Sequence, residues 1–165
     1  MLLFCPFWLF LVPGTLLLGT GLSVGAWLLP GPRRAFGVEL DIHSLLVASL
    51  MCLVGFQVII LGLFTKSFAI NHRLHPPNPW LSRMKHVLQL EKALLGSILV
   101  LAAGAAFLFL AINDWRKASY GPLDPRIEMR KMIPGATLLA LGVQSVFASF
   151  FLSILQLTDG ATDRK

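Results

Sequence analysis

The sequence predicts an all-α membrane protein in which four transmembrane helices form two tandem hairpins. The chain has 165 residues, of which 56% are hydrophobic and only 13% are charged, whereas a soluble domain carries about 25% charged residues. Its mean hydropathy is +0.75. No charged residue lies between Lys92 and Asp114, or between Lys131 and Asp159. Such stretches are long enough to cross a bilayer, which needs about 20 apolar residues.

Four apolar segments meet this length requirement. We expect spans at residues 13–29, 44–66, 92–113 and 133–157, which form one membrane domain over 1–157 and leave a polar tail at 158–165. The remainder is too short to build a soluble domain with its own core. No Lys or Arg precedes Arg33, whereas a signal peptide begins with basic residues. We therefore expect a chain that starts partway through a larger architecture.

Local signals indicate where the helices begin. Pro13 predicts the start of the first span, because the missing N–H of proline costs little in a first helical turn. Asp41 is expected to cap the second span by accepting hydrogen bonds from its first amides. Asp124 is followed by a proline, which is a stronger start signal of the same kind. It predicts a short helix, RIEMRKM, that ends before Pro134 and the fourth span.

The connection between the second and third spans is the longest and is basic. Its PPNP segment breaks any helix, and Trp80, Met84, Val87 and Leu88 then recur at helical spacing. This pattern predicts a short helix lying in the membrane surface. Arg73, Arg83 and Lys85 are candidates for holding a lipid phosphate. The alternative is that they are ordinary charges that fix the orientation of the protein in the membrane.

An internal repeat relates the two expected hairpins. The second and fourth spans run in the same direction, and each carries a Gly-x-Gln motif near its middle, Gly55 to Gln57 and Gly142 to Gln144. The two glutamines should therefore lie at similar depth and bond each other or a nearby carbonyl, since polar groups in lipid must be satisfied. Small polar residues, Ser145 and Ser149, would support tight packing beside Gln144. The alternative is that the amides line a groove for a lipid-linked substrate.

The orientation of the spans is weakly encoded. Seven Lys and Arg residues fall on the side of the termini and seven on the other side, so the positive-inside rule does not separate the two orientations. The side of the termini carries fewer acidic residues and three histidines. On this basis we expect both termini in the cytoplasm.

Catalytic chemistry is not apparent in the sequence. No nucleophile, base and orienting acid form a set of the kind covalent catalysis needs, and no glycine-rich phosphate loop is present. His72 and His75, three residues apart in a basic connection, fit a solvated face better than a metal site. We expect no catalytic residue, metal or cofactor on this chain, and no nucleic-acid partner.

Five segments taken together resemble a known membrane domain: LFCPFWLFLVPG, FGVELDIHSLLVASLMCLVGFQVIILGLFTKSFA, LEKALLG, YGPLDP and IPGATLLALGVQSVFASFFLSIL. Over about residues 3 to 157 the chain is similar to the C-terminal four-helix region of bacterial family 2 glycosyltransferases. The relatives implied are the polyprenyl-phosphate (dolichol-phosphate) mannosyl- and glucosyltransferases.

The resemblance implies a bacterial inner-membrane protein that docks a polyprenyl-phosphate acceptor for sugar transfer. The family places a cytoplasmic catalytic domain before the first span, with Asp-rich motifs for a nucleotide sugar and a metal. No Asp-x-Asp occurs here, so no catalytic residue carries over, and the resemblance implies a separate catalytic chain as partner. The alternatives are a small flippase-like transporter of a lipid-linked sugar and a structural scaffold.

Overall fold

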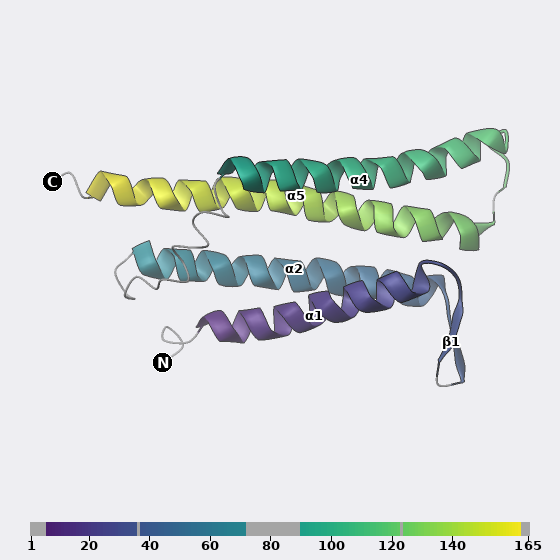
Figure 1. Cartoon of the computed structure of the whole chain (residues 1–165), viewed down its shortest axis with the longest axis horizontal. Coiled ribbons are helices and arrows are strands. Elements are labelled where there is room, and N and C mark those ends of the chain that lie inside the picture. The colour runs from purple at the N-terminus through teal and green to yellow at the C-terminus, as the bar shows by residue number, and fades with distance from the viewer. Residues whose placement is uncertain (1–5, 36, 72–89, 123, 163–165) are drawn as a thin grey trace.

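The computed structural model describes residues 6–35, 37–71, 90–122 and 124–162. Four long helices dominate it, and they lie side by side as two antiparallel hairpins (Figure 1). The helices are α1 (Pro6–Leu28), α2 (Ile42–Asn71), α4 (Leu90–Lys117) and α5 (Pro125–Thr162). The hairpins α1–α2 and α4–α5 meet through α2 and α5, which run in the same direction. The predicted all-α membrane fold with four spans is confirmed.

The helices are longer than the spans that the sequence predicted. Candidate membrane spans cover Trp8–Leu28, Ile42–Ser67, Glu91–Lys117 and Pro125–Ile154. The start predicted at Pro13 and the helix end predicted before Pro134 are wrong, because both prolines lie inside continuous helices. Long membrane helices tolerate proline where neighbouring groups satisfy the freed carbonyl. The segment RIEMRKM is therefore the beginning of α5, while the predicted interfacial helix lies outside the described residues.

Small residues at seven-residue spacing let the helices of each hairpin approach closely. A seven-residue period keeps one stripe of a helix facing its partner, and small residues there allow near contact of the backbones. The buried positions with this spacing are Gly14, Gly21 and Leu28 in α1, Ala48, Gly55 and Gly62 in α2, Ser97, Gly104 and Ala111 in α4, and Gly135, Gly142 and Ser149 in α5.

The contacts inside the first hairpin are between backbones. A Cβ atom added to Gly55 would lie 2.5 Å from the backbone nitrogen of Leu18 and 2.8 Å from the carbonyl oxygen of Gly14. A Cβ added to Gly21 would lie 2.7 Å from the carbonyl oxygen of Ala48. Glycine is required at these two positions because no side chain fits between the helices.

The second hairpin repeats this register with different side chains. Residues 87 positions apart occupy equivalent places in the two hairpins. Gly14 contacts Gly55 in the first hairpin, and Leu101 contacts Gly142 in the second, where a Cβ atom added to Gly142 would lie 2.6 Å from Leu101 Cγ. The same shift relates Gln57 to Gln144. The internal repeat predicted from the Gly-x-Gln motifs is thus present in the packing of the helices.

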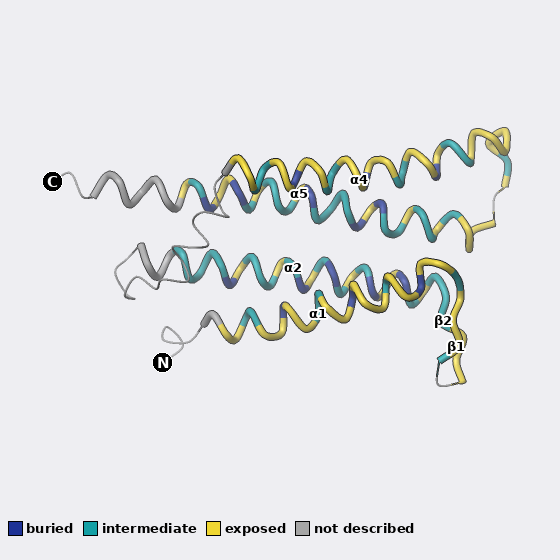
Figure 2. The backbone as a smooth tube through the Cα atoms, in the orientation of Figure 1, coloured by how far each residue is buried: buried dark blue, intermediate teal, exposed yellow. Residues whose placement is uncertain are grey.

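The outer surface of the bundle is apolar, as a lipid-facing surface must be. Much of the length of α1 and α4, the two outer helices, is exposed (Figure 2). The exposed side chains include Leu99 at 70% and Phe109 at 67%. Trp27 and Trp115 lie near the ends of α1 and α4 that are remote from the chain termini. This position is typical of an interfacial aromatic belt.

A short β-hairpin connects α1 to α2. Strands β1 (Arg33–Ala35) and β2 (Val38–Leu40) pair antiparallel, with Arg34 opposite Glu39. Gly37 in the turn has a φ of 78°, which glycine adopts without steric cost. Two three-residue strands carry too weak an alternation pattern to be recognised in sequence.

The predicted cap of α5 is present at Asp124. Its Oδ1 accepts a hydrogen bond of 2.9 Å from the backbone N–H of Arg126, and α5 begins at the next residue, Pro125. Replacing Asp124 with Ala should lower the stability of the detergent-solubilised protein by about 1 kcal/mol, the usual value of such a cap. Denaturant unfolding of Asp124→Ala beside Asp124→Asn measures it. Equal losses in the two variants would contradict the cap, because Asn keeps the acceptor oxygen.

Candidate functional site

Polar pairs follow the line along which α2 meets α5, here called the inter-hairpin seam. From the end remote from the termini they are Asp41 with Arg130, Ser49 with Thr137, and Gln57 with Gln144. The steps are eight residues on α2 and seven on α5, which is about 10–12 Å along a helix. The seam thus presents polar groups at three depths of an otherwise apolar bundle.

The first pair joins three helices at the remote end. Nη1 of Arg130 donates a hydrogen bond of 2.5 Å to the carbonyl oxygen of Leu28, the last residue of α1, and Nη2 donates to Oδ1 of Asp41. The two charged side chains are only 14% and 16% exposed. Arg126 Nε lies 3.7 Å from Oδ2 of Asp41. Arg130 therefore ties α5 both to the end of α1 and to the start of α2.

This arrangement corrects the role predicted for Asp41. Helix α2 does begin at the next residue, and the carbonyl oxygen of Asp41 accepts a hydrogen bond of 3.1 Å from the N–H of Leu45. The carboxylate, however, accepts from Arg130 of the other hairpin rather than from the amides of α2. A cation outcompetes neutral amides for a half-buried carboxylate because a charge-assisted hydrogen bond is about twice as strong.

Two further basic residues at this end, Lys117 and Lys131, also have acidic neighbours. Lys131 Nζ lies 2.5 Å from Oδ2 of Asp114 and 3.6 Å from Oε1 of Glu128. Lys117 Nζ lies 3.4 Å from Oδ1 of Asp114. These ion pairs link the end of α4 to the beginning of α5 and neutralise much of the positive charge there.

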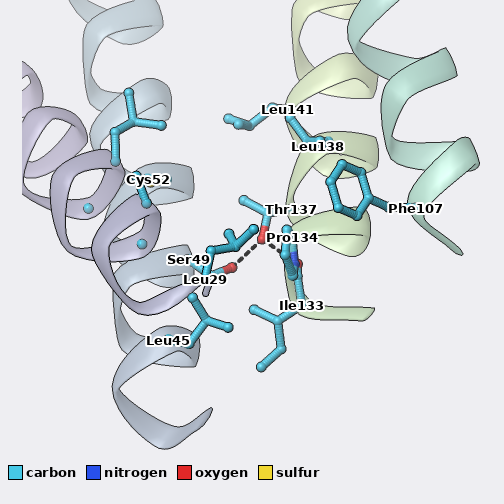
Figure 3. Close-up of a pocket in the computed structure, with 14 residues that line it drawn as sticks. Leu29, Leu45, Ser49, Cys52, Phe107, Ile133, Pro134, Thr137, Leu138 and Leu141 are labelled. Atoms are coloured by element: carbon cyan, nitrogen blue, oxygen red, sulfur yellow. Dashed lines mark hydrogen bonds between the residues drawn. The ribbon is translucent and has the colours of Figure 1, made fainter. Parts of the chain in front are cut away.

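The second pair is a hydroxyl bridge deeper in the seam. Thr137 Oγ1 donates its hydrogen to the carbonyl oxygen of Ile133 at 2.6 Å. Because a hydroxyl has one hydrogen to donate, Ser49 must be the donor in the hydrogen bond that joins the two side chains (Figure 3). A cavity of about 250 Å³ lies beside this bridge, walled by apolar groups that include Cys52, Phe107 and Leu138.

The third pair lies in a larger groove between α2 and α5. The groove has a volume of about 450 Å³ and is lined by Gln57, Ile60, Leu61, Phe64, Val143, Gln144, Phe147, Ala148 and Phe151. The rings of Phe64 and Phe151, whose centroids are 4.5 Å apart, lie at the terminal side of the two amides. Ligand pockets commonly have volumes of about 300–1,000 Å³ and combine apolar walls with a few polar groups.

The two amides share this groove but do not bond each other. Oε1 of Gln144 is buried and has no hydrogen-bond partner among the described residues. Gln57 is exposed along the groove. The sequence placed both glutamines at similar depth, and the structure brings them to one groove. The hydrogen bond expected between them is not formed, and Oε1 of Gln144 accepts from no donor among the described residues.

The other residues that the sequence predicted to pack beside the glutamines make their contacts inside one hairpin or inside one helix. Gly55 packs against α1 and Gly142 against α4. The hydroxyl of Ser145 donates to the carbonyl oxygen of Leu141, and that of Ser149 donates to the carbonyl oxygen of Ser145, both at 2.7 Å within α5. In the described part of the chain, neither hydroxyl makes a hydrogen bond across the seam, although Ser149 is buried.

The basic residues proposed to contact phosphate lie outside the described residues. These are Arg73, Arg83 and Lys85, and the same holds for His72 and His75. Within the ranges that the structure describes, no three His, Cys, Asp or Glu side chains gather closely enough to hold a metal ion.

Sequence reasoning missed Arg130, Ser49 and Thr137 as links between the hairpins. Each is a common residue type whose partner lies 88, 89 or 102 positions away in the chain. The available signal was their spacing, because Arg130, Thr137 and Gln144 follow one another at seven-residue intervals on α5.

Four helices that are long and apolar enough to cross a bilayer define a multi-pass membrane protein. The chain belongs to the glycosyltransferase family 2 C-terminal transmembrane region, whose family model matches residues 63–156. The match covers the last nine of the 30 residues of α2, all of α4 and most of α5, including Gln144. Comparisons with curated proteins and with solved structures found no significant match. The chain is therefore a glycosyltransferase membrane module.

Proposed function

We propose that this module docks a polyprenyl-phosphate acceptor and presents it to the catalytic domain of a family 2 glycosyltransferase on a separate chain. The observation that carries the proposal is the family match over residues 63–156. A bundle with an apolar outer surface holds such an acceptor at the membrane, where its phosphate can meet a nucleotide sugar delivered from water.

The proposed orientation places both termini in the cytoplasm of a bacterial inner membrane. The beginning of α1 and the end of α5 lie at the same end of the bundle (Figure 1). The end of α2 at Asn71 and the start of α4 at Leu90 lie at that end as well. The basic connection between them therefore leaves and re-enters the bundle on the side where the catalytic domain is proposed to work.

The charges at the two ends of the bundle support this orientation. At the remote end, Arg130 and Lys131 are held in ion pairs with Asp41 and Asp114. The end with the termini has seven basic and three acidic residues, against seven and five at the remote end. Because the numbers of Lys and Arg are equal, the proposed orientation rests on the smaller number of acidic residues at the end with the termini.

The direct test is co-purification followed by a transfer assay. Tagged chain is purified from native membranes in mild detergent, and the eluate is supplied with polyprenyl phosphate and a radiolabelled nucleotide sugar. We expect a family 2 catalytic chain to co-purify, and sugar transfer to need both chains. Transfer of equal rate by the catalytic chain alone would overturn the proposal.

Removing the basic residues of the connection should weaken acceptor binding. The triple variant Arg73→Gln, Arg83→Gln, Lys85→Gln should raise the apparent Kd for polyprenyl phosphate about tenfold or more, since each charge near the surface contributes about 1 kcal/mol. Binding to protein in nanodiscs of neutral lipid measures it. The matched control is Arg33→Gln, Arg34→Gln, Arg116→Gln, which removes three charges from exposed residues at the other end. Equal losses in both variants would show that only net charge matters.

A further inference from the structure

The groove that contains Gln57 and Gln144 lies deep in the membrane. The position of the two glutamines along their helices gives its depth. The uncharged stretch of α5 runs from Lys131 to Asp159, and Gln144 lies 13 residues from the first and 15 from the second. A stretch of this length crosses a hydrocarbon core of about 30 Å, and Gln57 lines the same groove as Gln144. Both amides therefore lie near the middle of the bilayer.

At this depth the free oxygen of Gln144 needs a hydrogen-bond donor. A buried amide oxygen without a partner is costly, and the surrounding hydrocarbon offers none. The other groove residues are aliphatic or aromatic except for Gln57. A prenyl chain, which has only C–H groups, can fill the apolar walls but cannot satisfy the oxygen. The oxygen is covered in this structure, so the Gln144 side chain must turn toward the groove before an O–H or N–H group of a ligand can reach it.

A lipid resting in either leaflet keeps its polar head at the interface, about 15 Å from this groove. Its hydroxyl groups reach Gln144 only while the head crosses the membrane. We infer that the groove is a transit site for the hydroxyl-rich sugar head of a prenyl-phosphate glycolipid passing between leaflets. The inference rests on the proposed function for the identity of that glycolipid, which is the product of the proposed transfer.

The rest of the seam fits this role. Gln57 and Gln144 together offer two carbonyl acceptors and two NH₂ donors, which match the mixed donor and acceptor character of sugar hydroxyls. The Ser49–Thr137 bridge lies about 10–12 Å further along the seam, and its two hydroxyls are the next polar groups toward the remote end. A head leaving the groove in that direction meets this bridge and then the Asp41–Arg130 pair.

The test is a leaflet-exchange assay with purified chain in phosphatidylcholine vesicles. The probe is a short-chain prenyl phosphoglucose, present in both leaflets and radiolabelled in the sugar. Periodate, which does not cross the bilayer, oxidises the sugar of the outer leaflet at once. Inner-leaflet probe reacts only after it crosses. We expect wild-type protein to give a second oxidation phase that protein-free vesicles lack.

The variant Gln57→Met, Gln144→Met keeps the length of both side chains and removes their hydrogen bonds. We expect it to slow the second phase about tenfold or more, which corresponds to a barrier that is higher by ~1.4 kcal/mol. The matched control is Leu46→Met, Leu50→Met on the exposed face of α2, which should exchange the probe at the wild-type rate. A wild-type rate in the glutamine variant, or no second phase in wild type, overturns the inference.

Two further measurements separate this inference from its alternatives. Thermal unfolding in detergent tests whether the amides hold the helices together, and a lower midpoint for the glutamine variant than for wild type would assign them that structural role instead. Polyprenyl-phosphate binding by the same variant tests the proposed function separately. We expect binding to be retained, because the phosphate is held at the interface. If wild-type protein does not bind polyprenyl phosphate, the proposed function is refuted. If wild-type protein binds it but does not exchange the probe between leaflets, only the transit site is refuted.

Discussion

Replacing Gly55 with Leu is expected to disrupt the first hairpin. A Cβ atom at this position would lie 2.5 Å from the backbone nitrogen of Leu18, and a backbone atom cannot move aside as a flexible side chain can. The helices must separate, which should cost about 3 kcal/mol, the upper end for overpacked cores. Unfolding of the purified protein in mixed detergent, followed by circular dichroism, measures the loss.

The chain supplies a matched control for this substitution in Gly19. It lies in α1, is exposed, and a Cβ added there meets no atom within 4 Å. Gly19→Leu should change the stability by no more than about 0.5 kcal/mol, as surface substitutions generally do. If both glycine variants lost the same stability, close approach of α1 and α2 at Gly55 would not hold the hairpin together.

Replacing Arg130 with Gln is expected to loosen the two hairpins from each other. The change removes a cation from a largely buried Asp41 and a donor from the carbonyl oxygen of Leu28. Breaking a buried pair costs about 3–5 kcal/mol, and we expect about 3 kcal/mol because both side chains keep some exposure to solvent. The measurement is equilibrium unfolding in detergent at neutral pH.

Arg126 is the control, because its side chain is 70% exposed and lies 3.7 Å from the same carboxylate. Arg126→Gln should cost less than about 1 kcal/mol, as exposed ion pairs do. Adding Asp41→Asn to Arg130→Gln should recover part of the loss, since the unpaired charge is then gone. Strictly additive losses from Asp41→Asn and Arg130→Gln would show that the two residues do not interact.

The number, order and pairing of the helices could be predicted because hydrocarbon imposes a strict length of uncharged chain. The beginnings of α1 and α5 in the membrane could not, because Pro13 was interpreted as a helix start and Pro134 as the boundary between a short helix and the fourth span. In water that interpretation is sound, since an interior proline costs about 3 kcal/mol. In the bundle both prolines lie within continuous helices, so tertiary packing overrode the local preference.

The candidate site was predictable only in part. The shared Gly-x-Gln motif correctly placed Gln57 and Gln144 on helices that run the same way, and both now line one groove. Which face each amide presents depends on how α2 and α5 are rotated, and no pattern within either segment sets that rotation. The seven-residue series of small residues, such as Gly135, Gly142 and Ser149, contains this information, because it fixes the opposite face of α5 against α4.

The uneven distribution of polar contacts has a consequence for how the protein is assembled during synthesis. Within the first hairpin the close contacts join residues of α1 and α2, such as Gly14 with Gly55, so the hairpin can close before α5 has been made. The seam bonds, by contrast, join residues such as Ser49 and Thr137, which meet only after nearly the whole chain has left the ribosome. Each hairpin can thus insert into the membrane independently, and the contacts between α2 and α5 along the inter-hairpin seam form last. For the same reason the seam is the first place where the finished protein can part without unfolding.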